Sequence, residues 1–165
     1  MAFVFPATNM TLAPKTPDPV STIEIIFPAD INHHGTLFGG QLMSWMDKVA
    51  YYAAFRHGNK PAVTASVESL DFGIAPHIGD LLDFVGKVIY TGTSSMVIRV
   101  DVFRTDVGKK NERRMCNSGF FTFVAVDEQG HPQPIPPLLV ETEEDRLNWA
   151  KGEEIKQAAA KRRQR

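Results

Sequence analysis

The sequence predicts an α+β fold in which one long helix packs against an antiparallel sheet. A short β-branched segment comes first, an apolar helix follows at about residues 39–56, and four strand-like segments joined by short turns come after it. Strands joined by short links are usually neighbours, so the four later strands should form a mostly antiparallel sheet around the helix. At 165 residues the chain is long enough to bury one core.

The first strand is expected at Ser21–Phe27, a β-branched run that ends before Pro28. Residues 1–19 contain four prolines and have no basic start followed by an apolar run. We therefore expect an N-terminal arm, and neither a signal peptide nor a transmembrane segment.

The long helix is expected from about Gly39 to Arg56, closed by Gly58 and Asn59. One apolar stripe at helical spacing consists of Leu42, Met46, Val49 and Ala53. Further apolar residues on a neighbouring side make the helix apolar nearly all round, which is typical of a helix wrapped by other structure.

Strands are then expected at 62–72, 81–90, 95–104 and 114–126, with turn-forming residues between them. A last helix is expected at 141–165, where acidic residues come first and basic residues last, as suits the helix dipole. The domain division is an arm at 1–19, the main domain at 20–138, and a C-terminal helix with a basic tail at 139–165. Because one helix cannot cover both faces of a sheet, the uncovered face predicts an oligomer.

Composition excludes several classes of function. The chain is 43% hydrophobic with a net charge of −1, so it has no overall electrostatic bias toward nucleic acid or membrane surfaces. Its one cysteine, Cys116, allows no intramolecular disulfide, sits mid-strand and is expected in the core, and a cytoplasmic location is expected. The adjacent His33 and His34 lack a metal-ligand spacing with the other histidines, so we expect no metal site.

Asp47 is the first candidate catalytic residue. It lies eight residues beyond Gly39, about 12 Å along the helix, on a side shared with Met43 and Ala50. Desolvation there should raise the pKa of its carboxyl, as suits a general base or a nucleophile. The alternative is a structural acid bonded to a nearby N–H or to Lys48.

Gly39, Gly40 and Asn32 complete the candidate catalytic set. Glycines at a helix start leave unpaired backbone N–H groups open to close approach, which suits an oxyanion hole. Asn32 offers a donor and an acceptor that could orient a water or polarise a carbonyl. The alternatives are a tight turn that needs glycine for steric reasons and an asparagine that only forms a turn.

Other catalytic and ligand-binding patterns are weak. The sequence contains no Gly-x-Ser-x-Gly elbow and no Gly-rich phosphate loop. Hydroxyls of the turn at 91–95 could contact a polar ligand tail. The basic terminus could bind phosphate or could simply be solvated, and it contains Lys156, Lys161, Arg162, Arg163 and Arg165.

The segment Pro28–Ala50 contains Asn-x-x-Gly, then Gly-Gly, then Trp-Met-Asp-x-x-Ala. It resembles the hotdog-fold acyl-CoA thioesterases, in particular the group of brain-type cytosolic acyl-CoA hydrolases and their single-domain bacterial relatives. Further matches lie at 63–67, 93–96, 120–124 and 136–143, and the resemblance covers about residues 20–160.

This resemblance implies a hotdog fold, in which a five-stranded antiparallel sheet wraps the long helix and two units pair edge to edge. It also implies active sites at the dimer interface, with Asn32 from one subunit and Asp47 from the other, and commonly a trimer of dimers. Segments that line the coenzyme A site in relatives match Ala65, Ser66, Val67, Ser94, Ser95 and Met96. The basic residue of the final helix that reaches the nucleotide phosphates has Lys156 as its nearest match.

The implied activity is hydrolysis of fatty acyl-CoA to free fatty acid and coenzyme A. An activated thioester needs only a carboxylate, a water and an oxyanion hole, so no cofactor is expected, and coenzyme A binds as part of substrate or product. One alternative is a hydroxyacyl-thioester dehydratase of the same fold. His33 and Asp47 are 14 residues apart, which is similar to the histidine–acid spacing of that group. The other is a non-catalytic acyl-CoA-binding module.

Overall fold

The structure is a computed structural model that describes residues 12–105 and 112–163. Within these ranges, five strands form one antiparallel sheet in the order β1-β3-β4-β5-β2. The elements are β1 (Val20–Ile25), the 3-10 helix η1 (Pro28–Asp30), α1 (Gly39–Gly58), β2 (Ala62–Phe72), β3 (Leu81–Thr91), β4 (Ser95–Thr105), β5 (Arg113–Ala125) and α2 (Glu143–Arg163). This arrangement confirms the predicted fold. Residues 1–11 of the expected arm and Arg165 of the basic tail lie outside the described residues.

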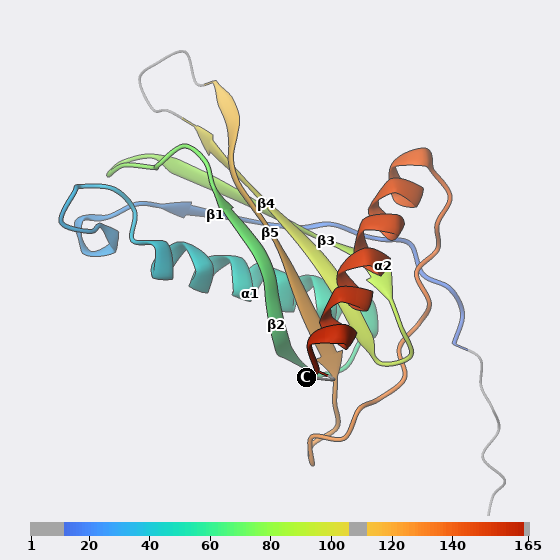
Figure 1. Ribbon diagram of the computed structural model, residues 1–165. Helices are drawn as coiled ribbons and strands as arrows, with labels where there is room; N and C mark the ends of the chain where they lie inside the picture. Colours follow the sequence, from blue (N-terminus) through green and yellow to red (C-terminus); the bar gives the residue numbers. More distant parts are fainter. Residues whose placement is uncertain (1–11, 106–111, 164–165) are drawn as a thin grey trace, which may run out of the picture.

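Helix α1 lies along one face of the sheet (Figure 1). The residues of its predicted stripe are all buried: Leu42, Met46, Val49 and Ala53. The facing side chains of the central strands are also fully buried, and the largest of them are Phe84, Ile98, Phe121 and Phe123. Each such side chain contributes roughly 1.5–3 kcal/mol by leaving water, so this contact is the main source of stability.

The ends of the elements differ slightly from expectation, for local reasons. Strand β1 stops at Ile25 because the chain already turns at Phe27, whose N–H donates to the Asp30 carboxylate at 2.9 Å. Helix α1 runs two residues further than predicted, and Asn59 then ends it in the left-handed conformation (φ 49°).

Helix α2 starts two residues later than expected, at Glu143. Thr142 precedes it, and the Thr142 Oγ1 accepts a hydrogen bond from the Asp145 N–H at 3.0 Å. In return the Asp145 carboxylate accepts one from the Thr142 N–H at 3.1 Å. This reciprocal pair satisfies two donors at the helix start and fixes where the helix begins.

The second face of the sheet is partly covered, which corrects the expectation that it is left open. Helix α2 packs there through Ile155, against Ile89 and Val97 of the central strands (Figure 1). The same face of the sheet keeps exposed apolar residues, Ile23 of β1, which is 65% exposed, and Met115 of β5, which is 53% exposed. The prediction of an oligomer therefore depends on this remaining surface and on the sheet edge.

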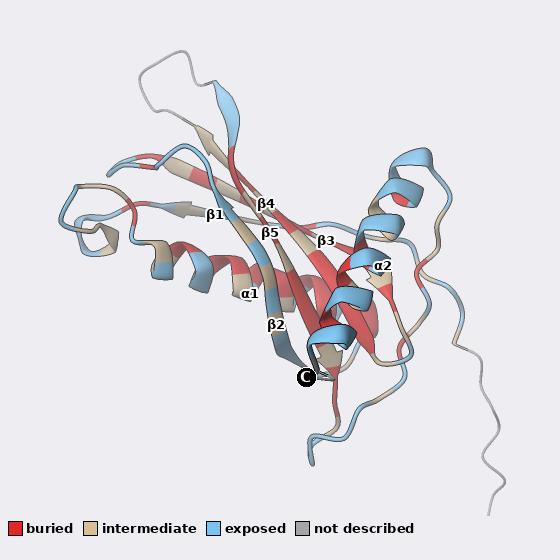
Figure 2. Ribbon diagram, in the orientation of Figure 1, coloured by how far each residue is buried: buried red, intermediate tan, exposed pale blue. Residues whose placement is uncertain are grey.

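Strand β2 forms one edge of the sheet and is exposed along most of its length, in contrast to the buried central strands (Figure 2). Its exposed side chains include Val63, Val67 and Phe72, of which Phe72 is 60% exposed. A long edge strand with exposed apolar side chains is a ready surface for pairing with another chain.

Replacing Gly152 by alanine should destabilise the protein, although alanine favours a helix by about 1 kcal/mol. An added Cβ would lie 2.4 Å from the Cβ of Tyr90, so α2 would have to move away from β3. We expect a loss of about 1–3 kcal/mol in the free energy of unfolding, measured by urea denaturation and circular dichroism.

Ala158→Gly, at an exposed position of the same helix, is the matched control. It should lose only the propensity difference of about 1 kcal/mol. A Gly152→Ala protein that is more stable than the parent would show that α2 is not held at this contact.

Candidate active site

The loop between η1 and α1 is organised around Asn32. Its Oδ1 accepts hydrogen bonds from the N–H groups of His34 at 2.9 Å and Thr36 at 3.3 Å, and its Nδ2 donates to the Thr36 Oγ1 at 3.0 Å. The turn-forming role considered from the sequence is therefore present. Asn32 is nevertheless half-buried and lines a pocket, so its amide holds the loop and also borders the site.

Helix α1 begins at Gly39 without a side-chain cap, because the N-cap residue is Phe38. The first N–H groups of a helix have no partner within it and carry partial positive charge. Gly39 lies against Phe72, and an added Cβ would be 3.3 Å from the phenyl ring. The glycine therefore lets the end of β2 come close to the start of the helix.

A pocket of about 240 Å³ lies between the helix start, the end of β2 and the loop that follows β2. Most of its lining is apolar, and its polar side chains are those of Asn32, Thr36 and Asn117. The complete lining is Asn32, Thr36, Leu37, Gly39, Leu42, Phe72, Gly73, Ile74, Ala75, Pro76 and Asn117. The structure thus brings together Asn32 and Gly39 as predicted, and adds Asn117, which sequence reasoning missed.

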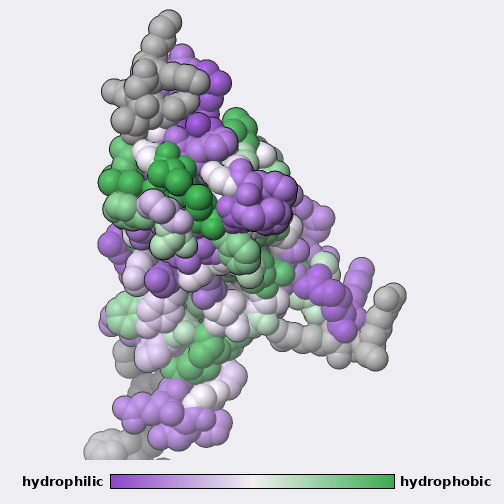
Figure 3. Space-filling model, turned by 90° about the vertical axis from the view of Figure 1, so that its left-hand side faces the viewer, coloured by the Kyte–Doolittle hydropathy of each residue, from purple (hydrophilic) through white to green (hydrophobic). Residues whose placement is uncertain are grey.

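This end of the molecule also carries hydrophobic residues on its surface, seen among hydrophilic ones in Figure 3. The exposed apolar side chains nearest to the pocket are Phe38, Phe72 and Ile74, between 47% and 60% exposed. The pocket mouth is therefore suited to an apolar ligand or to burial against another chain.

Asp47 is absent from the lining of the pocket in its own chain. It is half-buried, and Met43 on the same side of α1 is 41% exposed, so this side is less enclosed than the sequence suggested. The Thr64 hydroxyl, from β2, donates to the Asp47 carboxylate at 2.8 Å. Asp47 and Thr64 thus form a polar pair at the exposed edge of the sheet.

In the sequence, Thr64 lies within segment 63–67, which resembles the acyl-CoA thioesterases, but no role was predicted for its side chain. Alternation along β2 could have suggested that it faces α1, but two bulges, between Thr64 and Ser66 and between Val67 and Ser69, make the pattern unreadable. The bulges direct Ser66 to the opposite face, where it is paired with Thr122 of β5.

The predicted coenzyme A residues are brought together only in part. Ala65, Ser66 and Val67 lie on the exposed edge strand, with Ala65 and Val67 exposed. At the start of β4, Ser94 is partly exposed, but Ser95 is 6% exposed and the Met96 side chain is fully buried in the core. The Met96 side chain thus faces the core of this chain, because the central strand turns it toward α1.

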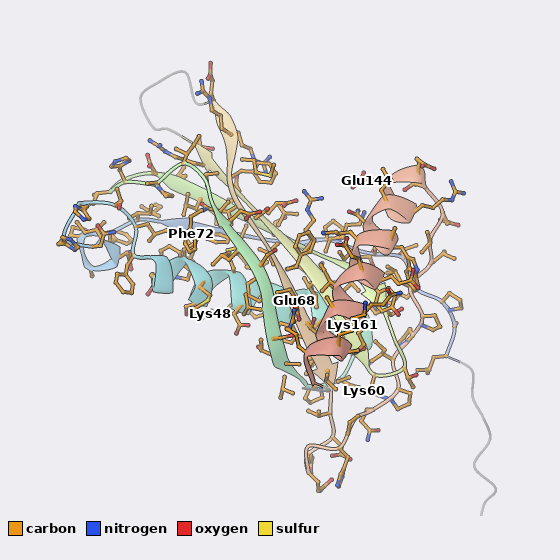
Figure 4. The ribbon with its side chains drawn as sticks, viewed as in Figure 1. Lys48, Lys60, Glu68, Phe72, Glu144 and Lys161 are labelled. Atoms are coloured by element: carbon orange, nitrogen blue, oxygen red, sulfur yellow. The ribbon has the colours of Figure 1, made fainter. Side chains whose placement is uncertain are left out.

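Helix α2 brings the basic residue Arg162 to β2. Figure 4 shows Glu68 on β2 close to the last turns of α2, where it pairs with Arg162. Glu68 also accepts hydrogen bonds from Ser66 and from Thr122, the latter at 3.4 Å. Burial alone would raise the pKa of Glu68, but these hydrogen bonds and the charge of Arg162 hold it below its ordinary value.

Cys116 is 4% exposed, and burial raises the pKa of its thiol to about 11, which confirms it as a core residue. Across the ranges that the structure covers, no three histidine, cysteine or acidic residues are grouped as a metal would need. None of the helices in those ranges has the length and apolar character to span a bilayer.

Comparison with known proteins identifies relatives. A family model described as "Thioesterase superfamily" matches residues 34–110. The chain is 42% identical over 120 residues to the uncharacterized acyl-CoA thioester hydrolase YkhA of Bacillus subtilis. The aligned segment covers 73% of this chain and 69% of that protein. It is 35% identical over 133 residues to the mouse cytosolic acyl coenzyme A thioester hydrolase, covering 80% of this chain but only 35% of the longer mouse protein.

Solved structures agree with these matches. An apo-hexameric acyl-CoA thioesterase superposes with a TM-score of 0.81 at 35% identity, over 87% of this chain and 92% of that one. An acyl-CoA hydrolase from Staphylococcus aureus, solved with butyryl coenzyme A and coenzyme A, gives 0.83 at 33% identity, over 90% of this chain and 92% of that one.

Three variants of the Staphylococcus aureus enzyme have been solved, in which an asparagine, an aspartate and a threonine are each replaced by alanine. Their positions are separated by 15 and then 17 residues. Asn32, Asp47 and Thr64 have the same two separations here. Asn32 and Asp47, taken from the sequence, and Thr64, found from the structure, therefore match in residue type and spacing the three that were changed in that relative.

Replacing Arg162 by glutamine should destabilise the protein at neutral pH and matter less in acid. The lowered pKa of Glu68 means that its ionised form contributes stability above its ordinary pKa of 4.5. That stability is lost as the pH falls through the lower pKa of the folded protein.

We expect a destabilisation of up to about 1 kcal/mol at pH 7, because Arg162 is partly exposed to water, and a smaller one near pH 3.5. Urea unfolding at both pH values measures this difference. Lys151→Gln is the control, because Lys151 pairs with Glu154 at an exposed site on the same helix. A destabilisation that does not change with pH would contradict the assignment to Glu68.

Proposed function

The chain belongs to the hotdog-fold acyl-CoA thioesterases, and we propose that it hydrolyses fatty acyl-CoA to free fatty acid and coenzyme A. The observation that carries this proposal is the shared spacing of Asn32, Asp47 and Thr64 on a scaffold that superposes on acyl-CoA hydrolases. In the structure Asn32 lines an apolar pocket at an uncapped helix start, while Asp47 and Thr64 pair outside that pocket, beside the edge strand β2. The helix start is where we propose that the thioester binds.

In the proposed reaction, the thioester carbonyl oxygen accepts hydrogen bonds from the N–H groups of Gly39 and Gly40. Negative charge that develops on this oxygen is stabilised there by the helix terminus. Asn32 stands beside the same pocket and orients the thioester or the water. No metal or cofactor is needed, because the thiolate of coenzyme A is a good leaving group.

Asp47 supplies the base or the nucleophile. As a base it removes a proton from the water that attacks the carbonyl carbon, and the proton then goes to the departing thiolate. As a nucleophile it forms a mixed anhydride, which water hydrolyses. The Thr64 hydroxyl holds the carboxylate in one orientation. Oxygen-18 label from water found in the Asp47 carboxylate after one turnover would identify direct attack.

The proposal requires two chains. Asp47 is outside the pocket of its own chain and lies next to the exposed edge strand β2. Pairing β2 with the same strand of a second copy would bury the exposed apolar residues of this region, which are Met43, Val63, Val67 and Phe72. It would also bring Asp47 of one subunit toward the Asn32 pocket of the other, as the resemblance implies.

A trimer of such dimers is the proposed higher assembly, since one similar structure is hexameric. The exposed apolar residues on the outer face of the sheet, Ile23 of β1 and Met115 of β5, are available for further subunit contacts. We propose a cytoplasmic location by analogy with the cytosolic mouse relative. For coenzyme A, we propose binding along Ser66 and Ser94, with Arg162 or Lys156 toward the phosphates.

The dehydratase alternative is not favoured. That reaction would need His33 beside the substrate, but His33 is exposed, stacks on His34 and does not line the pocket. A binding module without catalysis would need neither Asp47 nor its Thr64 partner.

Purified protein should release thiol from acyl-CoA substrates, followed with a thiol reagent across a series of chain lengths. Replacing Asp47 by asparagine should lower kcat at least 1000-fold, roughly the scale of losing a catalytic carboxylate, with circular dichroism unchanged. His33→Ala is the control and should retain most activity, whereas near-total loss would favour dehydration. Tight binding without turnover at any chain length would support the binding module.

Mixing two inactive variants tests the shared site. Asn32→Ala and Asp47→Ala subunits are co-expressed with different tags and purified through both. A mixed dimer keeps one intact site of two, built from the unchanged Asn32 of one subunit and the unchanged Asp47 of the other, so the protein purified through both tags should recover about half of the parent activity per dimer. No recovery in mixed dimers would place both residues in one chain's site.

A further inference from the structure

Asn117 is a polar residue at the sheet side of the pocket that the proposed reaction does not use. It lies on β5, paired with Phe72 of β2 and Val102 of β4, and is 4% exposed. Strand alternation directs it toward α1, as it does the buried Phe121 on the same strand. It therefore faces the first turn of the helix, which supplies Gly39 and Leu42 to the same pocket.

The orientation of its amide is fixed. The Nδ2 donates to the backbone carbonyl of Asp71 at 3.2 Å, and a carbonyl can only accept, so the nitrogen must face Asp71 and the oxygen must face away. That Oδ1 is enclosed, and no group among the described residues donates a hydrogen bond to it. A buried acceptor without a donor is unfavourable, so a donor supplied by a ligand would bind here strongly.

The surroundings restrict what that ligand can be. Gly73 walls the pocket beside Asn117, and an added Cβ there would lie 2.5 Å from the Cys116 carbonyl, so the wall is close-packed backbone. The other nearby side chains, Leu42, Phe72 and Ile74, are apolar. A mostly apolar group with one hydroxyl matches this environment.

We propose that Asn117 is a specificity residue for acyl chains that carry a hydroxyl group, an inference that rests on the proposed thioesterase function. The acyl hydroxyl donates a hydrogen bond to Oδ1, while the thioester carbonyl is held at the N–H groups of Gly39 and Gly40. The substrate class is short hydroxyacyl-CoA, and Asn117 discriminates it from the unsubstituted acyl-CoA of the same length. A site built to bond a hydroxyl penalises an analogue that lacks it, because the buried acceptor is then left without a donor.

The first test uses the unaltered protein, so it does not depend on the folding of a variant. Thiol release is measured with butyryl-CoA and with its forms hydroxylated at the second, third or fourth carbon. At least one hydroxylated substrate should have a kcat/KM roughly tenfold or more above that of butyryl-CoA. If all hydroxylated forms are equal to butyryl-CoA or poorer, the proposal is overturned while the thioesterase function stands. Absence of turnover with every substrate would overturn both.

The second test replaces Asn117 by leucine, which keeps the size of the side chain and removes the acceptor. The ratio of kcat/KM for the hydroxylated substrate to kcat/KM for butyryl-CoA should fall to about one. Ser118→Ala, the next residue on the strand and on its other face, is the matched control and should keep the preference. An equal loss with both substrates would overturn the proposal, because the acceptor would then serve a group that the two share, such as a pantetheine amide or a bound water.

Discussion

The packing of the apolar stripe of α1 against the central strands is the contact on which the other features depend. It fixes the helix along one face of the sheet, with Leu42 and Met46 buried beneath it. The uncapped start of the helix is thereby held at the end of the sheet, against the loop of Asn32 and the ring of Phe72. The free N–H groups at the start of α1 keep a fixed direction, because the helix is held by a close-packed core.

The same packing separates the two polar groups of the candidate site. Because one side of α1 faces the core, Asp47 lies on a different side of the helix. There the Thr64 hydroxyl of the edge strand donates a hydrogen bond to it. The pocket and the carboxylate therefore belong to different surfaces of one chain. In the proposed dimer, contact with a second copy would bring Asp47 of one subunit to the Asn32 pocket of the other. The carboxylate would then meet substrate only in the assembled protein.

Much of the fold could be predicted, because its signals are local. The stripe of α1 and the turn residues between strands located the five strands and the two long helices to within two residues of their described ends, whereas the short helix η1 was not predicted. Asn32, Gly39 and Asp47 were recognisable from residue type and from the resemblance. Other features depend on contacts between distant segments. The burial of Met96, the pairing of Arg162 with Glu68 and the place of Asn117 beside α1 all follow from how strands are aligned across the sheet, and spacing along the chain does not contain that information.

The two bulges of β2 have a consequence for how this chain behaves before it assembles. A flat exposed strand offers its hydrogen-bonding groups to any extended peptide, and uncontrolled association follows. Each bulge inserts an extra residue, Ala65 or Glu68, which interrupts the regular ladder and increases the local twist. A regular strand of another protein matches this shape less well than it would match a flat edge, so the bulges lower the tendency of the exposed strand to aggregate.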